Sequence, residues 1–200
     1  MPAAFDYPEN AHVCRHGPRG YPDYQSYRPW LRDEFAFRCV YCLVREQWGR
    51  VSGEFDVEHF TPQAKSPALG LVYENLLNAC HSCNLLKGGR DLPDPRLVLL
   101  RGTVLINPDG SVEGRTDDAK RLIKILGLDS NAYNTWRLIW IRNIELAEQY
   151  DREQYQRLMG FPDDLPDLSR LRPPSGNSRT EGINDSYYEK RRRGELPETY

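Results

Sequence analysis

Four of the five cysteines form two pairs with the spacing of metal ligands. Two residues separate Cys39 from Cys42, and two separate Cys80 from Cys83. A Cys-x-x-Cys turn supplies two sulfurs from one tight bend, and Zn²⁺ takes four such ligands in a tetrahedron. The two pairs therefore predict one structural zinc site. Residues 43–79 separate the pairs, which is a longer insert than a simple zinc ribbon carries.

The insert holds a second set of residues that could do chemistry. Glu58 and His59 are adjacent in "DVEHFTP", where apolar residues alternate with polar ones. A neutral imidazole with a pKa near ~6.5 can take a proton from water at neutral pH. Neighbours on a strand point to opposite faces, so a bulge or the strand end before Pro62 must bring both side chains to one site. Taken alone, a histidine in a strand is more often structural than catalytic.

The motifs of this region follow one another in a specific order. Cys-x-x-Cys precedes Asp-x-Glu-His-Phe-x-Pro, then Glu-Asn-Leu, then Cys-x-x-Cys-Asn-x-x-Lys. This order resembles the HNH endonucleases, the ββα-metal or His-Me finger nucleases, of the type with a zinc knuckle. The resemblance covers residues 37–90. More loosely, residues 117–137 are similar to a helical segment of bacterial HNH proteins encoded with retron or Septu-type anti-phage systems.

The resemblance implies a role for each polar residue of these motifs. It makes His59 the general base and Asn75 the brace of the loop that bears this histidine. It makes Glu58 and Asn84 the ligands of one catalytic divalent cation, and oxygen ligands favour Mg²⁺ or Mn²⁺. The family usually has Asp where this chain has Glu58, whose side chain is longer by one methylene.

Phosphodiester hydrolysis requires these residue types. A water must be deprotonated, and the charge on the transition state and on the leaving oxygen must be stabilised, which an imidazole and a hard cation can do. Lys87 lies three residues after Asn84, so we expect it on the same helix face, where it could contact a phosphate. Arg90 is a second candidate for backbone contact. We expect DNA as the substrate, and RNA is possible because a single-metal site does not itself choose the sugar.

A second class of function uses the same scaffold. A non-catalytic Cys₄ zinc module could bind nucleic acid or a partner protein. The net charge of −2 excludes a global field that draws the molecule to nucleic acid. A nuclease with this charge is expected to rely on a partner that delivers the substrate, as the effector of an anti-phage defence complex would.

The elements that must position these residues follow from the patterns. Alternation predicts a strand over 53–60, "YENLL" a second strand over 73–77, and the glycines after Lys87 the end of a helix. The remaining predicted elements are a hairpin within 96–114, a helix that begins at Thr116 and ends at Gly127, and a longer helix over 131–158.

These elements predict an α+β protein in four parts. They are an extended arm (1–30), a core with structural zinc (31–100) that the resemblance identifies as an HNH core, a hairpin and helical region (101–161) and a tail rich in proline and charge (162–200). A chain of 200 residues with 39% hydrophobic content can bury a core. Since no apolar run approaches the ~20 residues of a membrane span and no secretory signal opens the chain, we expect a cytoplasmic protein without a membrane partner.

Overall fold

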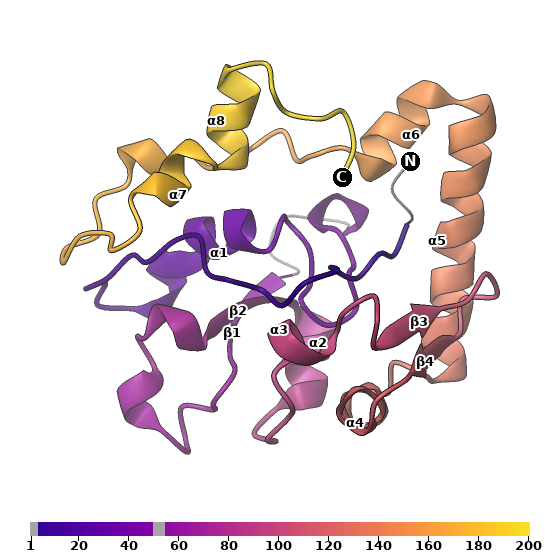
Figure 1. Cartoon of the computed structure of the whole chain (residues 1–200), viewed down its shortest axis with the longest axis horizontal. Helices are drawn as coiled ribbons and strands as arrows, with labels where there is room; N and C mark the ends of the chain where they lie inside the picture. Colours follow the sequence, from indigo (N-terminus) through magenta and orange to yellow (C-terminus); the bar gives the residue numbers. More distant parts are fainter. Residues whose placement is uncertain (1–3, 50–54) are drawn as a thin grey trace.

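The computed structural model describes residues 4–49 and 55–200, and shows a mixture of helices and small antiparallel sheets (Figure 1). This confirms the predicted α+β class. The strands are β1 (Phe55–His59), β2 (Leu76–Cys80), β3 (Val104–Ile106) and β4 (Val112–Gly114). The helices are α1 (Arg28–Glu34), α2 (His81–Lys87), α3 (Pro95–Val98), α4 (Asp117–Ile125), α5 (Asn131–Tyr150), α6 (Arg152–Met159), α7 (Glu181–Asn184) and α8 (Tyr187–Arg192). Short 3₁₀ turns are η1 (Tyr24–Tyr27), η2 (Glu46–Trp48), η3 (Pro67–Leu69), η4 (Tyr73–Asn75) and η5 (Leu168–Arg170).

The first sheet and the helix after it carry most of the predicted site. β1 pairs antiparallel with β2, with Glu58 opposite Leu77 and His59 opposite Leu76. α2 begins directly after β2 and contacts both strands. The predicted strand at 53–60 begins in residues 53 and 54, which lie outside the described residues. The specific ββα-metal core stays a prediction for this unit.

The sheet formed by β1 and β2 contributes side chains to two hydrophobic clusters. Phe55 packs in the larger cluster, which also contains the paired cysteines and residues of α4, α5 and α6. Val57 and Leu76 pack in the smaller one with Trp30 and Leu31 of α1. Because alternate side chains of a strand point to opposite faces, Asp56 and Glu58 lie on the face of β1 turned toward α2.

The region after the core begins as predicted but differs at one helix. Thr116 caps α4 by accepting a hydrogen bond from the Ala119 backbone N–H, and Asn107 closes the β3–β4 turn with Ser111. The single helix expected over 131–158 is two helices, because Asp151 leaves the helical conformation with φ −146° and caps α6. The side chain of Asp151 accepts from the Gln154 N–H at 3.0 Å.

The arm and the tail pair with each other. The backbone N–H of Arg19 donates to Gly176 O at 3.0 Å, and that of Ser175 donates to Arg19 O at 3.0 Å. An isolated bridge joins Pro18 to Asn177. Figure 1 shows the result, with α7 and α8 above α1 and the indigo N-terminal segment beside it. Both segments therefore belong to the folded structure.

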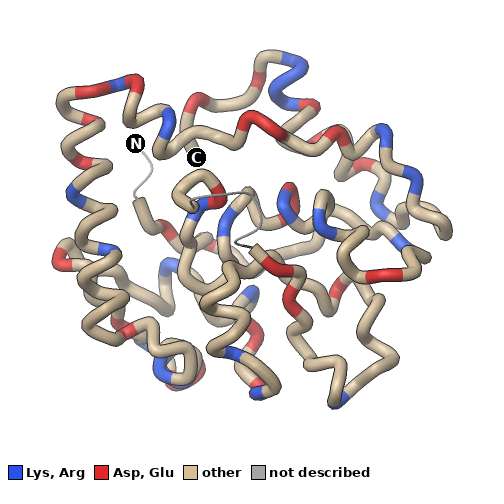
Figure 2. Tube along the Cα trace, turned by 180° about the vertical axis from the view of Figure 1, so that it is seen from behind, with Lys and Arg blue, Asp and Glu red and all other residues tan. Residues whose placement is uncertain are grey.

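Charge is spread over the molecule. Figure 2 shows acidic and basic residues interspersed along the trace, in keeping with the net charge of −2. Within residues 4–49 and 55–200, no helix combines the length and the apolar character needed to cross a membrane.

Candidate metal centre and active site

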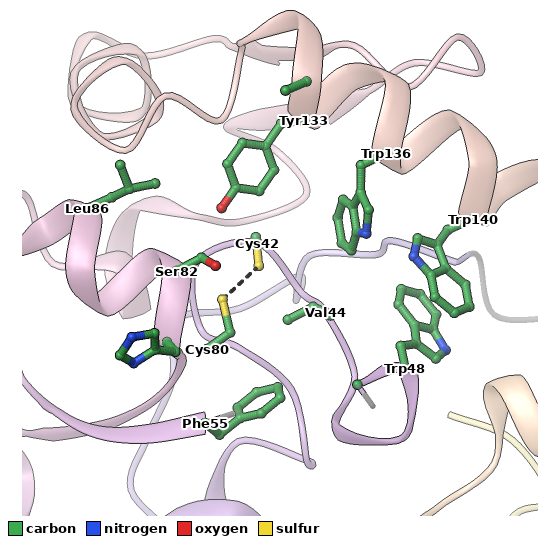
Figure 3. A pocket seen from close by; sticks show the side chains of 13 residues that line it. Cys42, Val44, Trp48, Phe55, Cys80, Ser82, Leu86, Tyr133, Trp136 and Trp140 are labelled. Carbon is green, nitrogen blue, oxygen red and sulfur yellow. Dashed lines mark hydrogen bonds between the residues drawn. The ribbon is translucent and has the colours of Figure 1, made fainter. Parts of the chain in front are cut away.

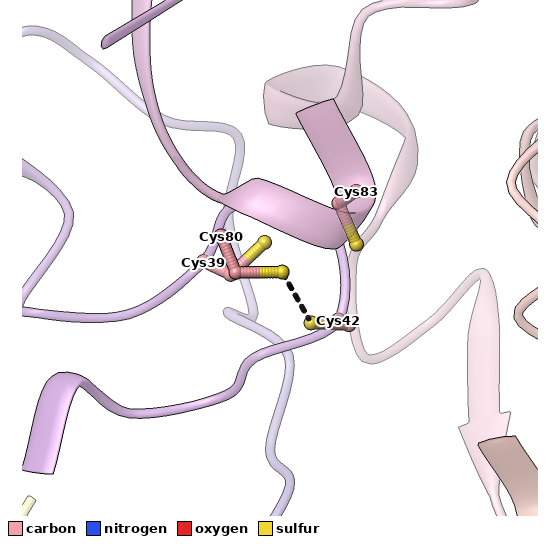
Figure 4. Close-up of side chains that lie close together, drawn as sticks. All are labelled: Cys39, Cys42, Cys80 and Cys83. Carbon is pink, nitrogen blue, oxygen red and sulfur yellow. Dashed lines mark hydrogen bonds between the residues drawn. The ribbon is translucent and has the colours of Figure 1, made fainter. Parts of the chain in front are cut away.

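The four paired cysteines converge on one point. Cys39 and Cys42 come from the turn after α1, Cys80 ends β2, and Cys83 lies in the first turn of α2 (Figure 4). Their sulfurs all lie within 4.8 Å of one another, and those of Cys42 and Cys80 are 3.7 Å apart. A tetrahedral ion with Zn–S bonds of about 2.3 Å holds its sulfurs about 3.8 Å apart. The cluster is therefore positioned to bind a metal ion, as the spacing predicted.

The local backbone shapes the first pair into a knuckle. The N–H of Leu43 donates to Cys39 O at 3.1 Å, and the N–H of Cys39 donates to Val44 O at 2.9 Å. Leu43 adopts the left-handed region with φ 62°, which a side-chain-bearing residue accepts only where its surroundings enforce it. Burial would raise the pKa of Cys39, but hydrogen bonds from the other three thiols hold it well below its usual range.

The fifth cysteine is separate from this centre. Cys14 is half-buried in the arm and is absent from the cluster formed by the other four. Burial raises the pKa of its thiol. Cys14 is thus a free thiol outside the candidate metal centre.

His59 is the last residue of β1, and its ring is held from two sides. Nε2 lies 3.0 Å from the backbone oxygen of Gly70, and the ring of Tyr24 meets the imidazole edge-on with centroids 4.9 Å apart. A carbonyl only accepts hydrogen bonds, so Nε2 carries the proton and Nδ1 keeps a lone pair. Burial lowers the pKa of His59 from 6.5, an effect that the contact with Gly70 opposes and the charge of Lys87 reinforces. The imidazole is therefore neutral at neutral pH.

Asn75 fastens the loop that carries Gly70. Its Oδ1 accepts from the Thr61 N–H at 2.8 Å, and its Nδ2 donates to the backbone oxygens of Thr61 at 3.1 Å and Leu69 at 3.2 Å. One buried amide thus ties the residues just after His59 to the residue just before Gly70. Asn75 therefore makes the contacts expected of a residue that braces the loop after His59.

Glu58 lies on the opposite face of β1 from His59 and is engaged there. Its Oε1 lies 2.5 Å from Lys87 Nζ, and its Oε2 accepts from Tyr41 OH at 3.0 Å. Burial raises the pKa of this carboxyl, and the Lys87 ammonium counteracts it. The structure does not bring Glu58 to the imidazole of His59, and a metal ion could bind Glu58 only by displacing Lys87.

Asn84 contacts a different carboxylate. Its Nδ2 donates to Asp56 Oδ2 at 2.8 Å, and Nδ1 of His81 lies 3.0 Å from the same oxygen. His81 is exposed, but it contacts Asp56, and Asp56 rather than Glu58 is the carboxylate beside Asn84.

The two basic candidates also differ from their expected placement. Lys87 is buried, and its ammonium donates to the backbone oxygen of His59 at 2.7 Å. In this position it offers no surface to a phosphate. Arg90 is exposed and donates to the backbone oxygens of Ile125, at 3.3 Å, and Leu86, so it links α2 to α4 while staying open to solvent.

The sequence analysis did not predict the two contacts between α2 and β1, which are Asn84 with Asp56 and Lys87 with Glu58. A signal for them was present in the sequence. Asp56 and Glu58 alternate on one face of β1, and Asn84 and Lys87 share one face of α2 at i and i+3. A helix laid along that face of the strand brings Asn84 to Asp56 and Lys87 to Glu58. The packing direction of α2 was the missing information.

An apolar cavity adjoins the cysteine cluster. It has a volume of about 680 Å³, and Cys42 and Cys80 line it together with aromatic residues of α5 and η2 (Figure 3). The rings of Trp48 and Trp140 stack in its wall, with centroids 4.4 Å apart and planes 8° from parallel. Trp140 is thus engaged in packing against Trp48.

Comparison of the sequence with protein-family models and with curated proteins finds no match. The resemblance to HNH nucleases therefore depends on the order of the motifs. The contacts of His59 and Asn75 are the structural features that bear on it most directly.

Proposed function

We propose that this protein is an HNH-type nuclease that hydrolyses phosphodiester bonds in DNA, with His59 as the general base. The observation that carries the proposal is the 3.0 Å contact between His59 Nε2 and Gly70 O. It fixes both the tautomer and the direction of the ring, which a general base needs. Asn75 supports the proposal because it holds the loop that supplies this carbonyl.

In the proposed reaction His59 Nδ1 takes one proton from a water molecule. The water oxygen forms a bond to phosphorus, and the bond from phosphorus to the leaving sugar oxygen breaks. That oxygen then receives a proton from solvent, and the His59 imidazolium returns its proton to solvent. The lowered pKa of His59 keeps the base neutral before each cycle.

The proposal includes two metal roles. Zinc in the Cys₄ cluster is structural, because four sulfur ligands leave no open position for a substrate. A hard cation, Mg²⁺ or Mn²⁺, would stabilise charge on the phosphate and on the leaving oxygen. Asn84 can offer Oδ1 to such a cation and has the Asp56 carboxylate beside it. Glu58, whose two oxygens both have partners, fits this role only if Lys87 moves.

The setting of the activity is also proposed. A net charge of −2 gives weak, salt-sensitive affinity for DNA, so a protein partner would deliver the substrate. The looser similarity of residues 117–137 to HNH proteins of anti-phage systems supports an effector role in such a complex. RNA is the other substrate that the site chemistry allows. A cytoplasmic location is part of the same proposal.

A plasmid-nicking assay with Mg²⁺ or Mn²⁺ tests the proposal. His59→Ala should lower the cleavage rate by about 10²- to 10⁴-fold, which is the usual contribution of a general base. His12→Ala is the matched control, because His12 lies in the arm and contacts Glu34, away from β1. Equal cleavage by wild type and His59→Ala, or no cleavage of DNA or RNA by either under any condition, would reject the enzyme.

One observation favours the alternative, a non-catalytic zinc module that binds nucleic acid or a partner protein. Both oxygens of Glu58 are occupied by Lys87 and Tyr41, so the expected cation site is closed in this arrangement. The module would bind nucleic acid equally well with and without His59 and would never cut it. Measuring binding and cleavage on the same two variants separates the two functions.

A further inference from the structure

A buried ion pair lies directly behind His59. Lys87, the last residue of α2, places Nζ 2.5 Å from Glu58 Oε1 and 2.7 Å from the backbone oxygen of His59. Both charged side chains are 1% exposed. Removing one partner of such a pair leaves an uncompensated buried charge, so the two residues hold each other in place.

The same pair is tied to the cysteine cluster from two sides. Lys87 lies one helical turn after Cys83 on α2. On the other side Tyr41 donates its hydroxyl to Glu58 Oε2 at 3.0 Å, while its backbone N–H lies 3.4 Å from Cys39 Sγ. A continuous chain of contacts thus runs from the metal-binding sulfurs to the backbone of His59.

We propose that Lys87 is a positioning residue for His59, through which helix α2, anchored at the cysteine cluster, sets the direction of the imidazole. Lys87 fixes the backbone oxygen of His59, and Gly70 fixes the ring of the same residue. A residue held at both its carbonyl and its ring keeps one rotamer. This role replaces the phosphate contact expected of Lys87, and its catalytic consequence rests on the proposed function.

The test compares Lys87→Met with Lys87→Arg in the full, zinc-loaded chain. Lys65→Met is the matched control, because Lys65 is a surface lysine paired with Asp91. The first readout needs no substrate. At about pH 8, where a histidine is neutral, ¹⁵N NMR of the His59 ring reports its tautomer.

We expect wild type and Lys65→Met to show the Nε2–H tautomer alone. Lys87→Met should show a mixture of tautomers with zinc content unchanged, and Lys87→Arg should restore much of the wild-type signal. In the cleavage assay Lys87→Met should lose kcat by about 10²-fold with KM little changed, as misplacement of a catalytic group does. If Lys87→Met does not fold, the double variant Glu58→Gln/Lys87→Met removes both charges and takes the same measurements.

The proposal would be overturned if folded Lys87→Met had the wild-type tautomer and the wild-type kcat. It would also be overturned if the His59 ring of the wild-type protein did not carry its proton on Nε2. Failure of the proposed function has a different signature. There His59→Ala cuts DNA as well as wild type, or neither cuts, while the tautomer comparison among the Lys87 variants still decides the positioning role.

Discussion

The imidazole of His59 and the backbone oxygen of Gly70 are joined by a contact of 3.0 Å, although eleven positions separate the residues along the chain. The contact connects the end of β1 to the end of the loop that Asn75 fastens. It leaves Nδ1 as the ring atom able to accept a proton. Several properties of the molecule depend on this relationship and on the cysteine cluster behind it.

The rate of cleavage should depend on pH through His59. Burial lowers the pKa of this histidine below 6.5, so the neutral, active base predominates at a lower pH than for an exposed histidine. The rate should therefore rise with pH only below about pH 6.5 and level off above it. A pH–rate profile under kcat/KM conditions measures this. A rate that still rises tenfold per pH unit above neutrality would contradict His59 as the titrating base.

Substitution of Asn75 should affect both stability and catalysis. Asn75→Ala leaves backbone groups of Thr61 and Leu69 without their partner, which costs about 1–3 kcal/mol of unfolding free energy. It should also lower cleavage more than tenfold, because the Gly70 carbonyl loses its support. Asn78 is the matched control on β2, since its buried amide donates to Arg38 O at 3.1 Å. Asn78→Ala should destabilise to a similar degree and keep the activity of the folded fraction.

Zinc content and stability should fall together when the cluster is broken. Cys80→Ser removes one of four sulfurs from the buried cluster. We expect loss of the bound metal and of at least about 3 kcal/mol of stability, because metal affinity contributes directly to folding. Elemental analysis and thermal unfolding with and without a chelator measure both. Cys14→Ser should retain the metal, and a Cys80→Ser protein with full zinc and an unchanged Tm would refute the assignment.

The contribution of Glu34 to the stability of the protein should be lost at low pH. Burial alone would raise the pKa of this carboxyl, but hydrogen bonds from the His12 side chain and the Arg15 N–H lower it. A carboxylate with a depressed folded-state pKa stabilises the protein above its unfolded pKa, near 4.5, and loses this effect as pH falls through the folded value. Glu34→Gln should thus cost about 1–3 kcal/mol at pH 7. The difference from wild type should shrink as the pH falls below about 4.5 and through the lower folded-state pKa, as urea titrations would show.

Features with a local cause were predictable from the sequence. Two Cys-x-x-Cys turns have few alternatives to a shared metal, and the side chain of Thr116 marked the start of α4. The break at Asp151 also had a local signal, because an aspartate followed three residues later by Gln154 is a capping pattern. The apolar period continues across that break, which is why one helix was expected.

Contacts that depend on packing were not predictable from the sequence. Glu58 and Lys87 are each plausible ligands for something outside the protein until α2 is placed on β1, and then they bind each other. The pairing of residues 17–19 with 175–178 had no periodic signal, because both segments are rich in glycine, proline and serine. Long-range hydrogen bonds of this kind are decided by tertiary structure alone.

The pairing of arm and tail has a consequence for synthesis. Arg19 pairs through its backbone with Ser175 and Gly176, so the ribosome must have added these residues before the arm can take its final course. Until then Asp33 also lacks the Tyr187 N–H that it accepts at 2.8 Å. Contacts between positions so far apart slow the search for the native state. The residues of the cysteine cluster and of strands β1 and β2 are all translated well before the tail, so we expect the arm and the tail to pair last.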